Sequence, residues 1–202
     1  SEMCIRDSTK TCPTFRTSRD AELTSKFYRN APILVNDETG SNPWGIRFAT
    51  LFNMATDSPL FRTNEQLIEL GALKDGNFYH LNGIRYVPLY EGKMIWLHNH
   101  QFGEFPSVGK RPSSISQTPL NKLSNSNSTL SPWYWVPEDE VICQMTKSDK
   151  DGNVIWHWPY HFYTAFRDVT NATTERTCVA SIVPGGVYAA GHNLPLIFNE
   201  RE

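Results

Sequence analysis

The sequence predicts a mixed, β-rich α+β fold built from short helices and hairpins. Three observations carry this prediction. Aromatic residues make up 12% of the 202 residues, with six Trp among them, and such side chains favour strands. An Asn-Gly pair lies between two short apolar runs at 78–87, which is the signal of a tight hairpin. A nearly continuous apolar run from Cys178 to Val183 ends at Pro184, as a buried strand does.

Composition is typical of a soluble globular protein with one good core or two small ones. Hydrophobic residues make up 39% and charged residues 20%, and the net charge of −2 gives no overall basic field that would indicate a nucleic-acid partner. The four cysteines have no CxxC spacing, so we expect reduced thiols. No apolar run approaches the length of a membrane span, and the N-terminus lacks the apolar segment of a secretory signal. The expected location is the cytoplasm, with no membrane partner.

The chain begins with a segment that does not enter the fold prediction. Residues 1–8 resemble translated read-through of a sequencing adapter. The first expected element is a helix that Ser18 or Asp20 can cap. It ends by Asn30, before Pro32.

A short strand is predicted at 33–35, and a turn follows at Asn42–Gly45. The turn reads Asn-Pro-Trp-Gly, which differs from the Asn/Asp-Pro-Pro-Tyr/Phe loop with which amino-methyltransferases hold a flipped base. We interpret it as the entry to a strand at 46–54. No catalytic loop of that type occurs anywhere in the chain.

A helix is predicted after Thr63, because Thr63 and Gln66 form a capping-box pattern. Leu67 and Leu70 are expected to face inward, and Gly71 to end the helix.

The predicted hairpin pairs 78–81 with 84–87 and leads into residues 88–95. There, Glu91 and Lys93 are two positions apart and would share one face of a strand. The plain interpretation of this pair is a solvated or partner-facing ion pair.

No metal site is predicted. His98 and His100 could share one strand face, yet no nearby Cys or Asp completes a ligand set. His157 and His161 are spaced as on a helix, but the glutamate of an H-E-x-x-H motif is missing and Pro159 interrupts the segment.

Residues 107–131 are the clearest linker, because Ser, Asn, Thr and Pro dominate their composition. Lys110, Arg111 and Lys122 give this loop a local positive charge. These side chains either contact phosphate from a mobile loop or only keep the loop solvated, and the sequence leaves both alternatives open.

Beyond the linker, strands are predicted at 140–145 and 154–158, around a turn at 148–153. An aromatic cluster follows the second strand, and such a cluster is more typical of a core than of a base-stacking platform. Its members are Trp156, Trp158, Tyr160, Phe162 and Tyr163.

The segment 166–184 carries the main chemical signal. A polar connection separates Arg167 and Asp168 from Glu175 and Arg176, and two strands joined in this way would bring the four charges together. One interpretation is a structural ion-pair cluster. The other is that one arginine stays free as a planar fork for phosphate or for the edge of a guanine.

Several blocks of the sequence resemble one family of DNA methylases. Residues 166–177 read FRDVTNATTERT and resemble the FRDI-(A/T)-x-A-T-x-ERT block of type IIG restriction-modification enzymes and of their relatives in BREX (PglX-like) and DISARM phage-defence systems. The resemblance also covers CPTFRTSRDAE at 12–22, ATDSPLFRT at 55–63 and PLYEGKMI at 88–95. The chain departs from the family pattern at Trp133, where arginine is usual, and after His100, where a basic residue is missing.

This resemblance implies a fragment of an adenine-N6 DNA methyltransferase, and it leaves open whether a nuclease is attached. It implies a junction region at 9–106 after the methyltransferase domain, a linker loop at 107–131, and the first part of a truncated target-recognition domain at 132–202. S-adenosylmethionine is the cofactor implied for the full-length protein, with none bound by this fragment. The implied partners are double-stranded DNA and the rest of its own methyltransferase chain, in the cytoplasm of a prokaryote.

The implied function is DNA-sequence recognition that positions duplex DNA for base methylation, without a catalytic or metal-binding residue in this chain. The candidate DNA-binding residues are Arg167 and Arg176, followed by Lys93, Arg62 and Lys110. The alternative is a non-catalytic protein–protein interaction domain of a defence complex, in which aromatic and charged surfaces contact another subunit.

Overall fold

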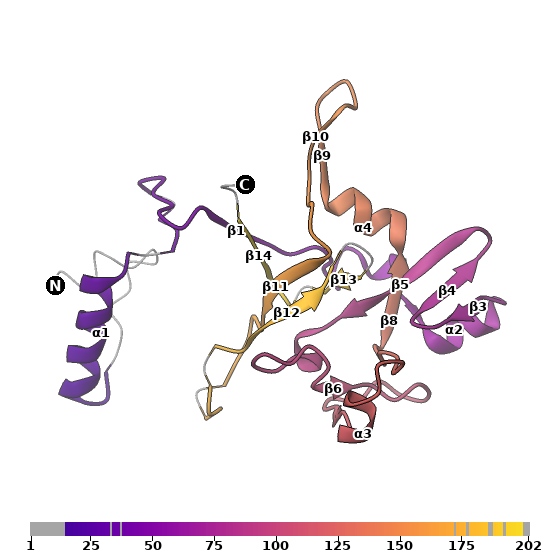
Figure 1. The fold of residues 1–202 in the computed structure, drawn as a ribbon, viewed down its shortest axis with the longest axis horizontal. Helices are drawn as coiled ribbons and strands as arrows, with labels where there is room; N and C mark the ends of the chain where they lie inside the picture. Colours follow the sequence, from indigo (N-terminus) through magenta and orange to yellow (C-terminus); the bar gives the residue numbers. More distant parts are fainter. Residues whose placement is uncertain are drawn as a thin grey trace. The chain divides into compact units, whose positions relative to one another are not determined.

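A computed structural model describes residues 15–32, 34–36, 38–171, 173–176, 178–185, 188–191 and 193–199 (Figure 1). The described residues form two compact units, one within residues 15–47 and 198–199 and the other within residues 48–197. Within the described ranges the fold is β-rich, with four α-helices and fourteen strands arranged mainly in antiparallel sheets. The predicted α+β class is confirmed. No helix in these ranges is long and apolar enough to cross a membrane.

The first unit contains helix α1, Ser18–Asn30, as predicted. The predicted cap, Ser18 or Asp20, is wrong: the cap is Thr17, because Asp20 occupies the third helical position and completes a capping box with it. The Asp20 amide donates to the Thr17 hydroxyl at 3.2 Å, and the Thr17 amide donates to the Asp20 carboxylate at 3.1 Å. Of the strand predicted at 33–35, residue 33 lies outside the described residues, and 34–35 are not in a strand.

The predicted turn at Asn42–Gly45 is closed by its own asparagine. The Asn42 side chain donates to the carbonyl of Ile46 at 2.7 Å and accepts from the amide of Ile46 at 3.0 Å. The strand that follows, β1, is Ile46–Ala49 and is shorter than the predicted 46–54.

The second unit is built around a six-stranded sheet with the order β2-β8-β5-β4-β3 and with β13 paired to β5. These strands are Arg62–Thr63 (β2), Leu73–Asp75 (β3), Phe78–Leu81 (β4), Ile84–Tyr90 (β5), Tyr134–Pro137 (β8) and Ala189–Ala190 (β13). Strands from both sides of the 107–131 segment therefore share one sheet.

The β4–β5 hairpin confirms the Asn-Gly prediction. Asn82 and Gly83 have φ angles of 52° and 81°, both left-handed, as the two central residues of a type I′ turn require. Leu81 pairs with Ile84 directly beside this turn.

A small aromatic core lies against the sheet. Leu67 on helix α2, Asn64–Glu69, is fully buried and packs with Tyr79, Tyr86 and Trp135. The capping box of Thr63 and Gln66 is confirmed. Leu70 was predicted to face inward but is 57% exposed, because the helix ends at Glu69 and Leu70 is its C-cap.

A second sheet in this unit joins β11, Phe162–Phe166, to β12, Ala180–Pro184, and to the first two residues of β14, Leu196–Asn199. The strand predicted at 178–183 begins two residues later than expected and includes Pro184 as its last residue. Pro184 pairs with Phe162 on an edge strand, where a missing N–H is tolerated.

The strand predicted at 140–145 is wrong, because this segment is helix α4, Glu138–Gln144. Three acidic residues, Glu138, Asp139 and Glu140, occupy the first turn and stabilise the positive end of the helix dipole. The helix is followed by a separate two-stranded hairpin of β9, Thr146–Ser148, and β10, Val154–His157. Of the predicted aromatic cluster, Tyr163 is buried and Phe162 is exposed, and the other three residues, Trp156, Trp158 and Tyr160, are half-buried.

Short elements complete the described part of the second unit. They are the 3-10 turns η2, Ser58–Leu60, and η3, Gly92–Met94, the strands β6, Gly103–Glu104, and β7, Ser116–Gln117, and helix α3, Leu120–Leu123.

Candidate functional site

Arg167 lies directly after β11, and its side chain reaches the turn at η3. Its Nε–H donates to the carbonyl of Gly92 at 2.8 Å and to that of Ile95 at 3.2 Å, and Nη2 donates to Ile95 at 2.5 Å. The Arg167 amide donates to the carbonyl of Val179 at 2.9 Å. One edge of the guanidinium is therefore fixed by main-chain carbonyls.

The Arg167 guanidinium also lies over an aromatic ring. Its Cζ is 5.0 Å from the centroid of the Trp96 ring, which is the range of a cation–π contact. Trp96 in turn stacks on Phe102 with the ring centroids 5.2 Å apart. Main-chain bonds and this stack hold the charged group in one place.

The positive charge of Arg167 has no anionic partner in the described part of the chain. No carboxylate of these residues lies within 4.0 Å of it, and the groups it contacts are carbonyls and a ring. Burial lowers the pKa of Arg167 from its ordinary value, but an arginine stays protonated at neutral pH. The predicted ion-pair cluster with Glu175 is thus not formed at Arg167.

Arg167 is one of five residues that line an open hollow, which we call the Arg167 hollow. It has a volume of about 500 Å³ and is lined by Arg167, Val169, Thr170, Asn171 and Thr174. Asn171 shapes its rim, because its side-chain carbonyl accepts from the amide of Thr173 at 3.1 Å and its main-chain carbonyl accepts from that of Thr174 at 2.9 Å. Arginine, threonine and asparagine side chains that line one hollow are suited to an anion.

Arg176, the second candidate, is exposed. Its Nη2 is 3.9 Å from the carboxylate of Glu175, whose side chain is more exposed still. A solvated pair at that distance contributes little, so the guanidinium of Arg176 can extend into solvent or toward a ligand.

The three weaker candidates for DNA binding differ in whether their charged groups already have partners within the protein. The Lys93 ammonium donates to the carbonyl of Ser113, and Arg62 Nη1 donates to the carbonyls of Pro59 at 2.6 Å and Phe61 at 2.8 Å. Lys110 is exposed and makes no hydrogen bond or ion pair with the described residues. Lys93 and Arg62 therefore have local structural partners, whereas Lys110 is open to solvent.

Arg111 anchors the 107–131 segment to the core of the second unit. Its guanidinium forms an ion pair with Glu91, which is only 5% exposed, and lies between the rings of Phe105 and Tyr134 at 5.5 and 5.6 Å. The predicted pairing of Glu91 with Lys93 is wrong, because η3 turns the chain between them and Arg111 takes the carboxylate.

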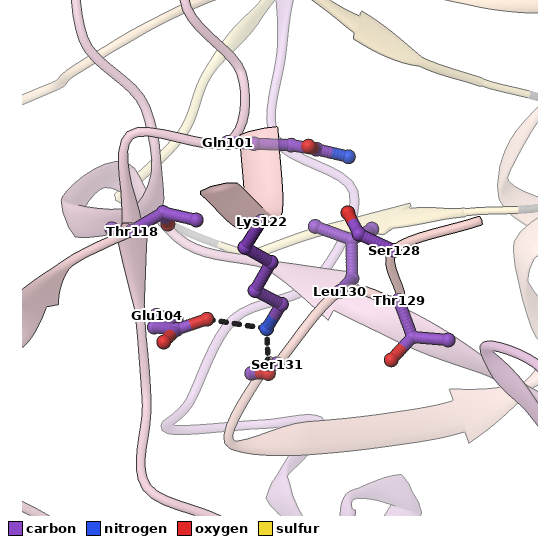
Figure 2. A pocket seen from close by; sticks show the side chains of 9 residues that line it. Gln101, Glu104, Thr118, Lys122, Ser128, Thr129, Leu130 and Ser131 are labelled. Carbon is purple, nitrogen blue, oxygen red and sulfur yellow. Dashed lines mark hydrogen bonds and ion pairs between the residues drawn. The ribbon is translucent and has the colours of Figure 1, made fainter. Parts of the chain in front are cut away.

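Lys122 makes a second anchor of the same segment (Figure 2). Its ammonium forms an ion pair with Glu104 and donates to the Ser131 hydroxyl at 2.9 Å. The pocket around it has a volume of only about 10 Å³, which is room for a single water molecule. Two of the three cations of this loop, Arg111 and Lys122, thus hold the loop in place through carboxylate partners. Of the two alternatives, phosphate contact stays open for Lys110.

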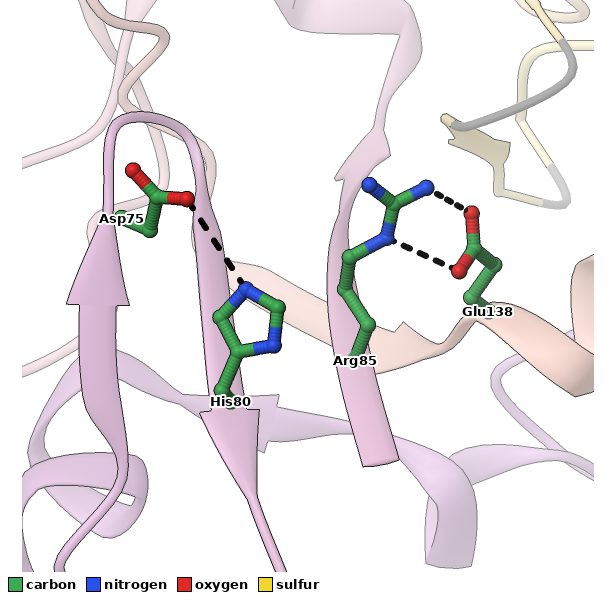
Figure 3. Close-up of polar contacts among 4 residues, drawn as sticks. All are labelled: Asp75, His80, Arg85 and Glu138. Atoms are coloured by element: carbon green, nitrogen blue, oxygen red, sulfur yellow. Dashed lines mark hydrogen bonds and ion pairs between the residues drawn. The ribbon is translucent and has the colours of Figure 1, made fainter. Parts of the chain in front are cut away.

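The outer face of the six-stranded sheet carries one ion pair and one histidine close to a carboxylate (Figure 3). Arg85 donates to Glu138 through both Nε and Nη2, and this hydrogen-bonded pairing is the main reason that the pKa of Arg85 is raised. His80 Nε2 lies 3.9 Å from the carboxylate of Asp75. This face therefore does not form a basic surface.

Metal ligands are not gathered anywhere in the described ranges, where no group of three or more His, Cys, Asp or Glu side chains could hold an ion.

The structure adds partners of Arg167 that sequence reasoning missed, namely Gly92, Ile95 and Trp96. Gly92 is required at its position, because a Cβ there would lie 2.6 Å from the Asn193 carbonyl oxygen and 3.6 Å from Arg167 Cγ. The one available signal was that PLYEGKMI and the 166–177 block both resemble the same family, but nothing in the sequence shows that they meet.

Comparisons of the chain with protein-family models, with curated proteins and with solved structures found no match.

Proposed function

We propose that this chain is a DNA-sequence recognition segment of an adenine-N6 DNA methyltransferase from a restriction-modification or phage-defence system, and that it positions duplex DNA for base methylation. The observation that carries the proposal is the Arg167 guanidinium. It is fixed by two carbonyls and a ring, lacks a carboxylate partner among the described residues, and belongs to a residue that lines an open hollow. It also lies in the block with the strongest resemblance to such enzymes.

DNA recognition uses two kinds of protein contact. Contacts to phosphates set the register of the protein on the duplex, and contacts to base edges specify the sequence. A chain with a net charge of −2 has to concentrate its positive charge locally to bind a polyanion. The segment from Arg167 to Arg176 offers two guanidiniums in one short stretch, one fixed and one exposed.

Catalysis would belong to another part of the same enzyme. The residues present do not fit a methylation site, because Asn42 in the Asn-Pro-Trp-Gly turn bonds the main chain of Ile46 through both atoms of its amide. S-adenosylmethionine is proposed as the cofactor of the whole enzyme, and the rest of the methyltransferase chain as the direct partner of this segment.

A second candidate, a protein–protein interaction domain of a defence complex, is favoured by one surface. The outer face of β11 and β12 exposes Phe162 and Ile182, and Ile182 is 62% exposed. Phe48 contacts Phe166 edge-on on the same sheet, with 5.7 Å between ring centroids. Such an apolar sheet face suits a protein partner better than a polyanion.

The dependence of DNA affinity on salt tests the proposal. We expect the binding constant of the chain for duplex DNA to fall steeply as salt rises, because phosphate contacts release counterions. Arg167→Gln should reduce the slope, whereas Lys150→Gln, which removes one charge from the exposed tip of the β9–β10 hairpin, should change it less. An affinity that is independent of salt, or absent at low salt, would favour the protein-interaction function instead.

A further inference from the structure

The fixed geometry of Arg167 limits what its guanidinium can reach. Nε and one N–H of Nη2 are bonded to the carbonyls of Gly92 and Ile95. The N–H groups of Nη1 and the second N–H of Nη2 remain, and they form the end-on edge of the group. That edge provides two parallel donors, which match two oxygens of one phosphate.

The position of each group in the duplex decides whether the free edge of the guanidinium binds a phosphate or a base. Base edges lie at the floor of a major groove about 8.5 Å deep, so a side chain has to project from the protein to reach them. Arg167 instead lines a hollow and is held against the main chain, over Trp96. Phosphates are the outermost groups of the duplex and can enter such a hollow.

The rest of the hollow has the chemistry of a phosphate contact. Thr170, Asn171 and Thr174 line it together with Arg167, and Thr and Asn side chains commonly bind DNA phosphates. Its volume of about 500 Å³ leaves room for a phosphodiester with its adjoining sugar.

Arg176 has the opposite properties. Its side chain is 60% exposed, and its contact is a long, solvated one to Glu175. A guanidinium that extends from the surface can enter a groove and bind guanine O6 and N7 as a bidentate donor.

We infer that the Arg167 hollow binds a phosphodiester of the DNA backbone and that Arg176 is the arginine that reads a base edge. The inference rests on the proposed function and divides two tasks between two residues of one block. Arg167 sets the register of the protein on the duplex, and Arg176 contributes to sequence preference.

The first experiment tests the hollow without DNA. The probe is inorganic phosphate, titrated into the ¹⁵N-labelled chain against sodium chloride of equal ionic strength. We expect saturable shifts of the Arg167 Nε–H resonance and of the amides of Thr170 and Thr174 in the parent chain, and unshifted amides of Thr170 and Thr174 in Arg167→Gln. Shifts that chloride reproduces, or a response confined to other residues, would overturn the phosphate site.

The second experiment selects duplexes from a random-sequence library with the parent chain, with Arg167→Gln and with Arg176→Gln. Arg167→Gln should weaken binding to all selected sequences alike and lower the salt slope by about 1. Arg176→Gln should relax preference at one base pair, by about 5- to 150-fold. A change in base preference caused by Arg167→Gln, with an unchanged salt slope, would overturn the assignment.

A third arm distinguishes the loss of a phosphate contact from unfolding of the protein. It is needed because Arg167 also fixes the turn at Gly92–Met94. Single phosphates of a selected duplex are replaced by neutral methylphosphonates, which leaves the protein intact. We expect one replacement to weaken binding by the parent chain and to have little further effect on Arg167→Gln. If no single position behaves in this way, the inference is wrong.

Different results would refute the proposed DNA function and the assignment of Arg167 to a phosphate. A parent chain without salt-dependent DNA binding refutes the DNA function, whatever the phosphate titration shows. A parent chain that binds DNA with a steep salt slope, but whose Arg167 resonance ignores phosphate, keeps the function and refutes the assignment of Arg167.

Discussion

The Arg167 guanidinium donates to the carbonyl of Ile95, 72 positions earlier in the chain, with 2.5 Å between Nη2 and the oxygen. This bond joins the 88–95 segment to the 166–177 segment, and these are two of the blocks on which the proposed function rests. A single side chain thus connects an element beside the first sheet to the end of a strand in the second. Its structural role and its proposed phosphate contact use different edges of one group.

The structural role predicts that Arg167→Gln destabilises the chain by about 1–3 kcal/mol, because the carbonyls of Gly92 and Ile95 lose their donors. Urea unfolding followed by tryptophan fluorescence measures the change. Arg176→Gln is the matched control and should change stability by less than about 0.5 kcal/mol, because Arg176 is exposed. Equal effects of the two substitutions would contradict the structural role.

The close approach of Gly92 to Asn193 predicts that Gly92→Ala destabilises the chain by about 1–3 kcal/mol. The new Cβ would lie 2.6 Å from a main-chain oxygen, so the backbone has to move. Gly71→Ala is a useful comparison, because Gly71 has a φ of +81° but open space around it, so its cost is conformational strain alone. Only Gly92→Ala should shift the Arg167 Nε–H resonance, and an unchanged resonance would refute the contact.

Local signals in the sequence predicted their elements well. The capping box of Thr63 and Gln66 and the Asn82-Gly83 turn depend on neighbouring residues, and both are confirmed, as is the β-rich class. The strand predicted at 140–145 is helix α4 in the structure, because the short apolar run at 141–143 fits both periods. The three acidic residues of its first turn are the local signal that favours a helix.

Contacts between distant residues could not be predicted in the same way. The spacing of Glu91 and Lys93 indicated a shared strand face only if the chain stayed extended, and η3 lies there instead. Arg111 bonds Glu91 from 20 positions away, and Arg167 meets Gly92 from 75 positions away. Arg167 could be proposed from its residue type and block, but its burial and its hollow depend on the tertiary fold.

The anchor formed by Arg111 predicts that Arg111→Gln opens the 107–131 segment. Removing this partner leaves the buried Glu91 carboxylate without its guanidinium, which should cost about 2–4 kcal/mol. Hydrogen exchange should show faster exchange at the amide of Thr118, which donates to the carbonyl of Phe102 at 2.9 Å. Lys110→Gln removes the same charge from the adjacent residue, which is exposed, and should leave exchange and stability unchanged. Similar effects of the two variants would show that Arg111 is not an anchor.

His100 predicts how stability depends on pH below neutrality. Burial lowers the pKa of His100 in the folded state below its ordinary value of 6.5, and its ring lies 6.4 Å from that of the buried Tyr90. Between the two pKa values the unfolded chain therefore binds more protons than the folded chain. The contribution of His100 to stability is fully present above about pH 6.5 and is lost as pH falls toward the folded pKa. We expect His100→Gln to flatten the dependence of the free energy of unfolding on pH from 7.5 to 5, measured by urea titrations. His157→Gln, at an exposed position, should keep the slope of the parent chain, and a parent-like slope in His100→Gln would show that this histidine is not the source.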